Sequence, residues 1–242
     1  MNVVEASGLG KRYGRTWALR QCTLEIPAGR VTALVGPNGA GKTTLLNLAV
    51  GLTAPSAGAV TVLGGRMAGS PAALDGIAFV AQDTPLYKNL TAADMIYVTR
   101  SLNRRFDDGY ARGRLSELGI PPRRKTGKLS GGQQAQLALT LALARRPRLL
   151  VLDEPVAALD PIARHDFMGT VLAAASADGV SVLLSSHVLT ELERVAGYLV
   201  LMSRGQVQLA GQVEDLLAAH GHASLEELAL HYLRETTREV TR

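Results

Sequence analysis

The sequence is poor in cysteine and aromatic residues, and it has no long apolar run. Cys22 is the single cysteine among 242 residues, so an internal disulfide and a cysteine-based zinc site are excluded. Aromatic residues make up 4% of the chain and do not alternate with arginines, which argues against single-stranded nucleic-acid binding. Residues 137–144 are mostly apolar but stop at Arg145, well short of the ~20 residues that span a bilayer. With no signal-peptide pattern at the start, the chain is expected in the reducing cytosol.

Acidic residues are scarce in the middle of the chain, which leaves an uneven charge. The 26 basic residues exceed the 21 acidic ones, and the segment 100–148 alone holds 12 Lys/Arg against three acids. That segment is therefore +9 and the rest of the chain −4. A basic block suits nucleic acid, anionic lipid headgroups or nucleotide phosphates, and it is equally typical of a solvated helical surface.

The order of the predicted elements indicates an α/β fold. Strands alternate with helices on both sides of residues 91–144, which read as mostly helical and open with a capping box, Thr91-x-x-Asp94. We therefore predict a main domain over 1–211, a helical block at about 86–145 inserted in it, and a helical tail over 212–242. Strands are predicted across the first 36 residues, at 59–63, 77–81, 149–152 and 180–184, and as a hairpin at 198–202 and 206–209. Helices are predicted at 42–50, from Pro161 and from Ser224.

Residues 36–43 read Gly-Pro-Asn-Gly-Ala-Gly-Lys-Thr, between an apolar strand and a helix. They fit the phosphate-binding loop G-x4-G-K-[ST], in which consecutive backbone N–H groups surround phosphate oxygens at a helix N-terminus. Lys42 is predicted to bridge the terminal phosphates and Thr43 to hold Mg²⁺. The nucleotide-binding candidates are Gly36, Asn38, Gly39, Ala40, Gly41, Lys42, Thr43 and Thr44.

Residues 149–154 are four apolar residues followed by Asp153 and Glu154. A buried strand that ends in an acid would place Asp153 near the phosphate-binding loop, where it can orient Mg²⁺. Glu154 could then polarise a water for attack on the γ-phosphate. The alternative is a strand that ends in two solvated acids.

Residues 129–133, Leu-Ser-Gly-Gly-Gln, begin a helix that runs towards Ala144. A serine N-cap followed by two glycines makes a second helix N-terminus suited to phosphate. The sequence LSGGQ, lying between the phosphate-binding loop and the run LLVLDEP, resembles the ATP-binding subunit of an ABC transporter. The resemblance extends from about Val3 to Gly211. It implies a P-loop NTPase core with a mixed sheet, an N-terminal antiparallel β-subdomain and an inserted helical subdomain.

The resemblance also implies roles for single residues. Tyr13 matches the aromatic residue that stacks on adenine, with Trp17 as the rival ring. Gln82 matches a glutamine that contacts Mg²⁺ and the attacking water, so Thr43, Gln82 and Asp153 are the metal candidates. His187 matches the histidine that contacts the γ-phosphate, which makes Glu154, His187 and Gln82 the catalytic candidates. Asp160 matches the aspartate of the D-loop at the dimer contact.

The function implied is that of an ATPase that powers a separate membrane-spanning permease. Two such subunits enclose ATP, the phosphate-binding loop of one facing Ser130, Gly131, Gly132 and Gln133 of the other. ATP and Mg²⁺ are the expected cofactors, the cytoplasmic face of the membrane the expected location, and no nucleic-acid partner is expected. Residues 86–103 and 224–227 are similar to exporter ATPases, which favours export. An ABC-type ATPase acting on DNA or the ribosome is the alternative.

Overall fold

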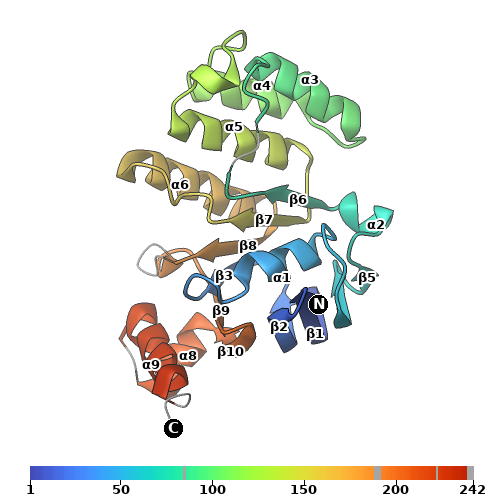
Figure 1. Cartoon of the computed structure of the whole chain (residues 1–242). Helices are drawn as coiled ribbons and strands as arrows, with labels where there is room; N and C mark the ends of the chain where they lie inside the picture. The colour runs from blue at the N-terminus through green and yellow to red at the C-terminus, as the bar shows by residue number, and fades with distance from the viewer. Residues whose placement is uncertain (84–85, 188–191, 222, 239–242) are drawn as a thin grey trace.

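The computed structural model describes residues 1–238 except 84–85, 188–191 and 222, and within these limits it forms two sheets with helices (Figure 1). A four-stranded sheet has the order β2-β1-β4-β5, and a six-stranded sheet has the order β10-β9-β3-β8-β7-β6. The predicted α/β fold with a mixed sheet and an N-terminal antiparallel sheet is confirmed.

The smaller sheet is antiparallel throughout. Its long strands β1 (Asn2–Tyr13) and β2 (Thr16–Pro27) form a hairpin, and β4 (Ala57–Val62) pairs with the other edge of β1. A two-residue strand, β5 (Arg66–Met67), completes it. Apolar residues on one face of this sheet pack on helix α1 (Lys42–Ala49), because strand residues alternate between faces.

The larger sheet carries the predicted nucleotide residues. Four strands run parallel to β3 (Val31–Val35), and β10 (Gln206–Gln212) pairs antiparallel at one edge. Every residue of β3 and β7 is buried, as expected where helices cover both faces of a parallel sheet. Helix α1 covers one face, and α5 (Gly131–Ala144) and α6 (Pro161–Ala177) cover the other. The remaining parallel strands are β6 (Ile77–Val80), β7 (Leu149–Asp153), β8 (Ser181–Ser186) and β9 (Tyr198–Ser203).

The helical block lies beyond β6, at the top of Figure 1. It contains α3 (Ala92–Leu102), α4 (Asp108–Glu117), the 3₁₀ turn at Thr126–Lys128 and α5, and it follows the short helix α2 (Pro71–Leu74) and β6. Its buried residues form an apolar cluster of their own. The predicted capping box is present: Thr91 Oγ1 accepts the Asp94 N–H at 3.1 Å, and the Thr91 N–H donates to the Asp94 carboxylate at 2.9 Å.

The C-terminal residues form two helices, α8 (Val213–His220) and α9 (Leu225–Arg238), where the sequence had indicated one. Val213, Leu216, Leu225 and Leu228 join the same apolar cluster as the face of the large sheet that α6 covers. The helical tail therefore packs directly on the sheet. Residues 222 and 239–242 of the predicted tail lie outside the described residues. Among the described residues, no helix combines the length and apolarity needed to cross a membrane.

Candidate functional site

The phosphate-binding loop lies between the end of β3 and the start of α1, and it is enclosed by other segments of the chain. A Cβ at Gly36 would collide with the carbonyl oxygen of Met202 in β9. Gly41, the N-cap of α1, has a φ of 101°, and a Cβ there would lie 2.6 Å from Leu19 in β2. Both positions therefore require glycine, for packing as well as for access of the backbone to phosphate.

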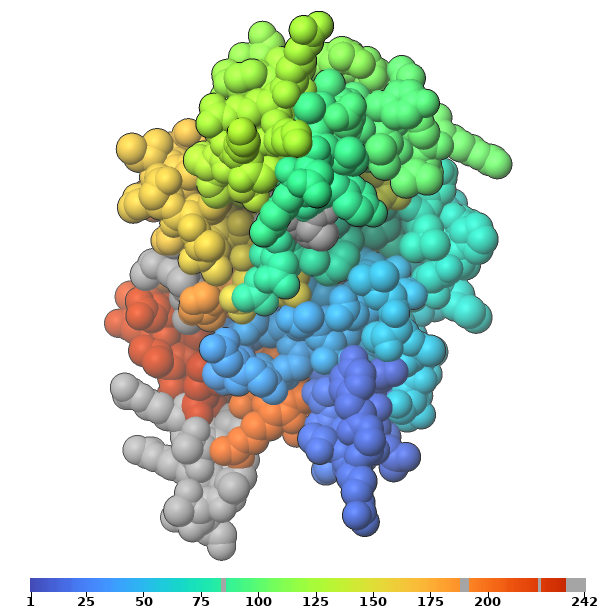
Figure 2. Space-filling model, turned by 45° about the horizontal axis from the view of Figure 1, so that its top comes forward, coloured from blue at the N-terminus to red at the C-terminus, as the bar shows by residue number. Residues whose placement is uncertain are grey.

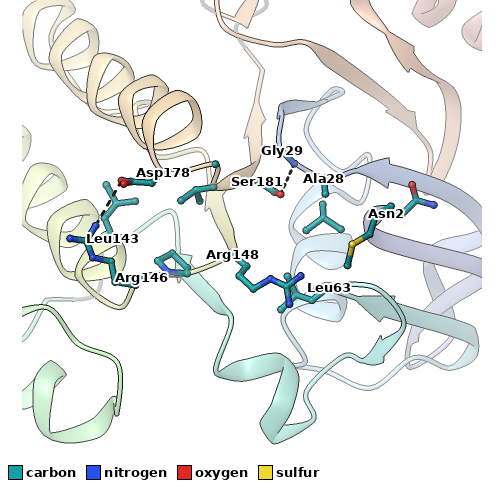
Figure 3. A pocket seen from close by; sticks show the side chains of 14 residues that line it. Asn2, Ala28, Gly29, Leu63, Leu143, Arg146, Arg148, Asp178 and Ser181 are labelled. Atoms are coloured by element: carbon teal, nitrogen blue, oxygen red, sulfur yellow. Dashed lines mark hydrogen bonds and ion pairs between the residues drawn. The ribbon is translucent and has the colours of Figure 1, made fainter.

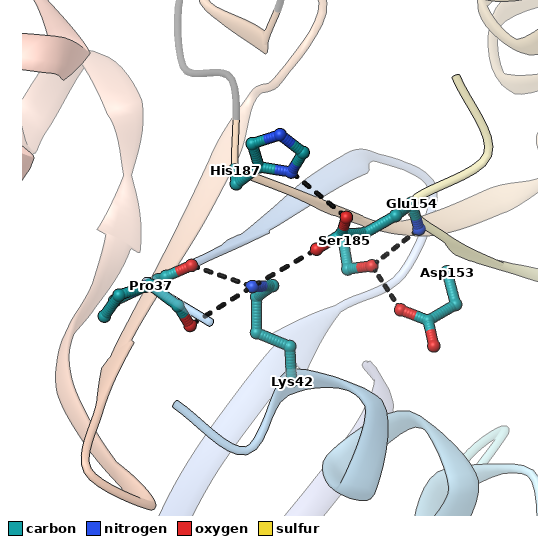
Figure 4. Close-up of polar contacts among 7 residues, drawn as sticks. Pro37, Lys42, Asp153, Glu154, Ser185 and His187 are labelled. Carbon is teal, nitrogen blue, oxygen red and sulfur yellow. Dashed lines mark hydrogen bonds and ion pairs between the residues drawn. The ribbon is translucent and has the colours of Figure 1, made fainter. Parts of the chain in front are cut away.

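Lys42 begins α1 and is almost fully buried. Its Nζ donates to the carbonyl oxygen of Gly36 at 2.8 Å and lies 3.4 Å from a carboxylate oxygen of Glu154 (Figure 4). The other carboxylate oxygen of Glu154 lies 3.0 Å from Nδ1 of His187. The structure thus joins Lys42, Glu154 and His187 in one row at the carboxyl edge of the parallel strands, where α/β sheets bind their ligands.

Lys42 and Glu154 balance each other's charge in a part of the site with little access to solvent. The side chains of Lys42 and Glu154 are 6% and 12% exposed, whereas that of His187 is 48% exposed. A buried ammonium or carboxylate without a partner costs several kcal/mol, so each charge of this pair is retained because of the other. Since an ionised carboxylate only accepts hydrogen bonds, Nδ1 of His187 carries a proton and its Nε2 is left for another partner.

Ser185 was not among the predicted site residues, yet it connects the two acids. Its hydroxyl donates to Asp153 Oδ1 at 2.6 Å and accepts the backbone N–H of Glu154 at 2.9 Å. Ser185 and Asp153 are paired across β8 and β7, and both are buried. Glu154 has a φ of 45°, in the left-handed region that non-glycine residues seldom occupy, and the bond to Ser185 helps to hold it there.

The predicted metal candidates lie at the carboxyl edge of the parallel strands, but no described hydrogen bond joins them to one another. Asp153 is 2% exposed, and its Oδ2 is not used by any described hydrogen bond. Thr43, in the first turn of α1, and Gln82, which follows β6, are exposed. Val80 and Leu152 are paired across β6 and β7. Gln82 comes two residues after Val80 and Glu154 two residues after Leu152, so both follow neighbouring strand ends. A carboxylate oxygen and a hydroxyl are ligands that suit Mg²⁺, so these side chains fit that ion.

The rest of the phosphate-binding loop is open to solvent or held by backbone bonds. Asn38 and Gly39 are exposed, and Thr44 is half-buried. Ala40 is buried, and its carbonyl accepts the N–H of Gly205 at 3.0 Å, which ties the loop to the β9–β10 turn.

Tyr13 and Trp17 lie at the end of the β1–β2 hairpin, next to the strand segment that contacts Gly41. Tyr13 is 52% exposed, and the Lys11 ammonium lies 5.2 Å from its ring centre. Trp17 is half-buried, and its ring packs over Gly10, where a Cβ would lie 3.0 Å away. Of the two rings, that of Tyr13 is the more exposed to solvent.

Ser130 caps α5 through a reciprocal capping box with Gln133. The Gln133 N–H donates to Ser130 Oγ at 3.2 Å, and the Ser130 N–H donates to the Gln133 side chain. Gly131 and Ser130 are exposed, while a Cβ at Gly132 would lie 2.8 Å from Ala163 in α6. No described hydrogen bond or ion pair joins residues 130–133 to Lys42, Glu154 or His187.

Asp160 caps the neighbouring helix, α6. Its carboxylate accepts the N–H groups of Ile162 at 3.0 Å and Ala163 at 2.9 Å. Because Ala163 is also the residue against which Gly132 packs, the starts of α5 and α6 lie side by side. Ile162, in the first turn of α6, is 76% exposed.

A cavity of about 530 Å³ lies at the opposite edge of the large sheet, away from these residues (Figure 3). It is lined in part by Arg146, Arg148 and Asp178. Arg146 is ion-paired to Asp107 at 2.7 Å and lies 3.9 Å from Asp178. None of the predicted nucleotide residues lines this cavity, so it is separate from the candidate site.

Comparison with known proteins identifies the family of the chain. The family model described as ABC transporter matches residues 19–157, and a model described as an AAA domain, putative AbiEii toxin, matches residues 124–193. A lantibiotic transport ATP-binding protein of Streptococcus pyogenes is 31% identical over 229 residues, covering 93% of this chain and 95% of that protein. A Fe(3+) ions import ATP-binding protein of Mesorhizobium japonicum is 37% identical over 89% of this chain, which spans 62% of that relative's length.

Solved structures give the same result. An ATP-binding subunit of an ABC transporter superposes with a TM-score of 0.85 at 27% identity, covering 96% of this chain and 99% of that one. A dimeric post-hydrolysis ATP-binding cassette bound to ADP and Pi superposes with a TM-score of 0.76 at 25% identity, covering 87% and 98%. The chain therefore belongs to the ABC transporter family, as one of its ATP-binding subunits with ATPase activity.

Proposed function

We propose that this chain binds ATP with Mg²⁺, pairs with a second ATPase subunit around the nucleotide, and drives a separate membrane permease from the cytoplasmic face. The observation that carries the proposal is the row Lys42–Glu154–His187 beside the phosphate-binding loop (Figure 4). The relatives compared above are named for transport, which supports this function over action on DNA or the ribosome.

The row suggests how the residues divide the work. Without nucleotide, the Lys42 ammonium is shared between the Gly36 carbonyl and the Glu154 carboxylate. When phosphate oxygens reach the loop, Lys42 turns to them, and Glu154 is free to accept a proton from the attacking water. His187 would hold Glu154 through Nδ1 and turn Nε2 towards a phosphate oxygen.

Asp153 and Thr43 are the side chains that would hold Mg²⁺, with Gln82 on the neighbouring strand end. Ser185 fixes one oxygen of Asp153 and leaves Oδ2 for the ion or its water shell. Bound there, Mg²⁺ supplies charge neutralisation for the transferring phosphoryl group. Tyr13, the more exposed of the two rings at the hairpin end, would stack on the base.

Residues 130–133 serve the nucleotide of the second subunit in this proposal. The Ser130 cap and the free N-terminus of α5 make a phosphate-seeking end that no described contact connects to the chain's own Lys42. Asp160, at the adjacent start of α6, would then lie at the dimer contact. The solved dimeric relative supports pairing of two such subunits.

The Glu154→Gln substitution tests the proposal. The amide keeps the shape of the side chain but cannot accept a proton, so ATP binding should persist while turnover falls by on the order of 100-fold or more. Phosphate release and ATP titration on the same preparation separate the two effects. Glu227→Gln, in the remote α9, is the matched control and should hydrolyse ATP normally. Wild-type turnover in Glu154→Gln would reject Glu154 as the base.

The helical block would dock the permease, because it interrupts the sheet and contributes to the nucleotide only through residues 130–133. Tyr87 is 66% exposed at its beginning, next to the half-buried Leu86. Cysteines placed at these two positions should cross-link to the co-purified permease. Cross-links found only from α9 would contradict this docking face.

We further propose export as the direction of transport. The support is the similarity of residues 86–103 and 224–227 to exporter ATPases and the end-to-end similarity to the lantibiotic transport protein, whereas other relatives are named for import. In proteoliposomes that expose the ATPase outward, external ATP should drive a labelled peptide cargo into the lumen. ATP-driven movement out of the lumen would mean import.

A further inference from the structure

The structure divides the basic segment 100–148 into two kinds of residue. Several of its arginines are neutralised on the surface of the helical block, for example Arg114 by Glu117 at 2.6 Å and Arg146 by Asp107 at 2.7 Å. Arg100, Arg105 and Arg112 also have carboxylate partners. In the loop between α4 and α5, by contrast, no ion pair among the described residues includes a cation.

We call Lys88, Arg123, Arg124, Lys125 and Lys128 the basic patch. All five are exposed, and no described ion pair includes any of them. Lys88 comes from a different segment and is brought alongside by the bond from the Gly127 N–H to its carbonyl oxygen at 3.1 Å. In Figure 2 the green of the residues before α3 meets the lime of the residues before α5 on one face.

The patch is held by a network of backbone bonds. The buried Thr126 donates its hydroxyl to the Tyr87 carbonyl at 2.9 Å and its N–H to the Leu90 carbonyl at 2.9 Å. In return, the Ala92 N–H donates to the Arg124 carbonyl at 3.1 Å. The backbone that presents these cations is therefore already ordered, so binding a partner does not require the loop to fold.

Asp94, which follows Lys88 in the same segment, forms no described ion pair with the patch. Asp94 accepts both the N–H and the hydroxyl of Thr91, and these hydrogen bonds lower the pKa of its carboxyl. Its charge is thus committed to the cap of α3. Five exposed cations that no described ion pair includes, on an ordered backbone, form a site for a polyanionic partner.

We propose that the basic patch binds the anionic lipid headgroups of the membrane surface. Exposed cations from two segments, spread over one ordered surface, match a fluid array of phosphates better than they match a single phosphate. The inference rests on the proposed transport function in one respect: docking of the permease at Leu86 and Tyr87 would turn the adjoining basic patch to the membrane. The patch would then orient the ATPase against the bilayer beside its permease.

Vesicle flotation of the purified full chain, without nucleotide, tests the patch independently of ATP hydrolysis. Vesicles of phosphatidylcholine with about one-third phosphatidylglycerol should carry the protein, and phosphatidylcholine alone should not. The variant R123Q/K125Q/K128Q should bind the anionic vesicles about 100-fold more weakly, since each cation near such a surface contributes about fivefold. Arg124 is kept because its guanidinium donates to the Lys128 carbonyl.

The control R15Q/R20Q/R194Q removes the same charge from exposed positions elsewhere and should bind the vesicles as the unchanged chain does. ATP binding by both variants shows that they are folded. Equal loss in the two variants would overturn the proposal, because net charge alone would then explain it. Absence of binding to anionic vesicles would also overturn it. Normal vesicle binding by R123Q/K125Q/K128Q, with loss of the co-purified permease, would assign the patch to an acidic segment of that protein instead.

Discussion

The two helix N-termini suited to phosphate, at Lys42 and at Ser130, differ in how much of the chain surrounds them. Lys42 is buried, and three distant segments meet around it: β2, β9 and the strand end that carries Glu154. Ser130 is exposed, and its side-chain hydrogen bonds are local, within its own capping box. The helix N-terminus at Lys42 is thus surrounded by segments of its own chain, whereas the one at Ser130 is left accessible to a partner.

The largest effect should come from Ser130→Arg. A long side chain at the cap would fill the space for a neighbour's phosphate, so hydrolysis should fall by on the order of 100-fold while ATP binding to the monomer stays normal. Mixing this variant with Lys42→Ala should restore about a quarter of the activity, because half of the dimers then hold one intact shared site. Strong hydrolysis by Ser130→Arg alone would show that residues 130–133 do not serve a neighbour.

Lys42→Ala should weaken ATP binding by about 10- to 100-fold, because the phosphates lose their buried cationic donor. Titration of the protein with labelled ATP measures this. Lys128→Ala is the matched control, since Lys128 is an exposed lysine of the helical block with no described ion pair. Equal ATP affinity of the two variants would mean that the enclosed helix N-terminus at Lys42 does not contribute to nucleotide binding.

Ser185→Ala should lower kcat by about tenfold and change KM little, because Asp153 loses a donor and the Glu154 backbone loses its acceptor. It should also raise the Mg²⁺ concentration needed for half-maximal rate. Ser185→Thr, which keeps the hydroxyl, should recover most of the rate. A purely structural role would lower the melting temperature of the alanine variant without changing its Mg²⁺ dependence.

The smallest effect concerns the helical block alone. The Tyr110 N–H and the Arg146 guanidinium lower the pKa of Asp107, so its charge stabilises the fold above pH 3.8 and ceases to do so as the pH falls through the lowered pKa. Asp107→Asn should therefore melt slightly below wild type at pH 7, and the difference should shrink in acid. Thermal melts across this range measure it, with Asp166→Asn as the control. ATP affinity should be unchanged; a loss would show that the block supports the Lys42 end.

The sequence predicted the fold and most of the site because those features depend on local patterns. Apolar runs before residues 36 and 153 identify buried strands, and their ends at one sheet edge bring Lys42 and Glu154 together. The capping box at Thr91 and the serine N-cap at Ser130 were likewise predicted from spacing and are present. The roles of the site residues remain predictions.

Other features depend on pairing across the sheet and could not be predicted from spacing. Strand β8 extends to Ser186, beyond the predicted end at 184, so Ser185 faces Asp153 inside the sheet instead of lying in a loop before His187. The usable signal was a polar residue directly after an apolar run, two positions before a candidate histidine. Helix α8 lies within the predicted helical tail, but it was not predicted as a separate helix because no side chain caps its start at Gln212.

The contacts that enclose the phosphate-binding loop also determine whether the loop loses its conformational entropy during folding or during nucleotide binding. Met202 lies over Gly36, and Gly205 donates to the carbonyl of Ala40, so the loop takes its binding shape when the chain folds and not when ATP arrives. Nucleotide affinity then owes little to induced order near Lys42. The β9–β10 turn thereby helps to keep the phosphate-binding loop in shape from the far side of the loop.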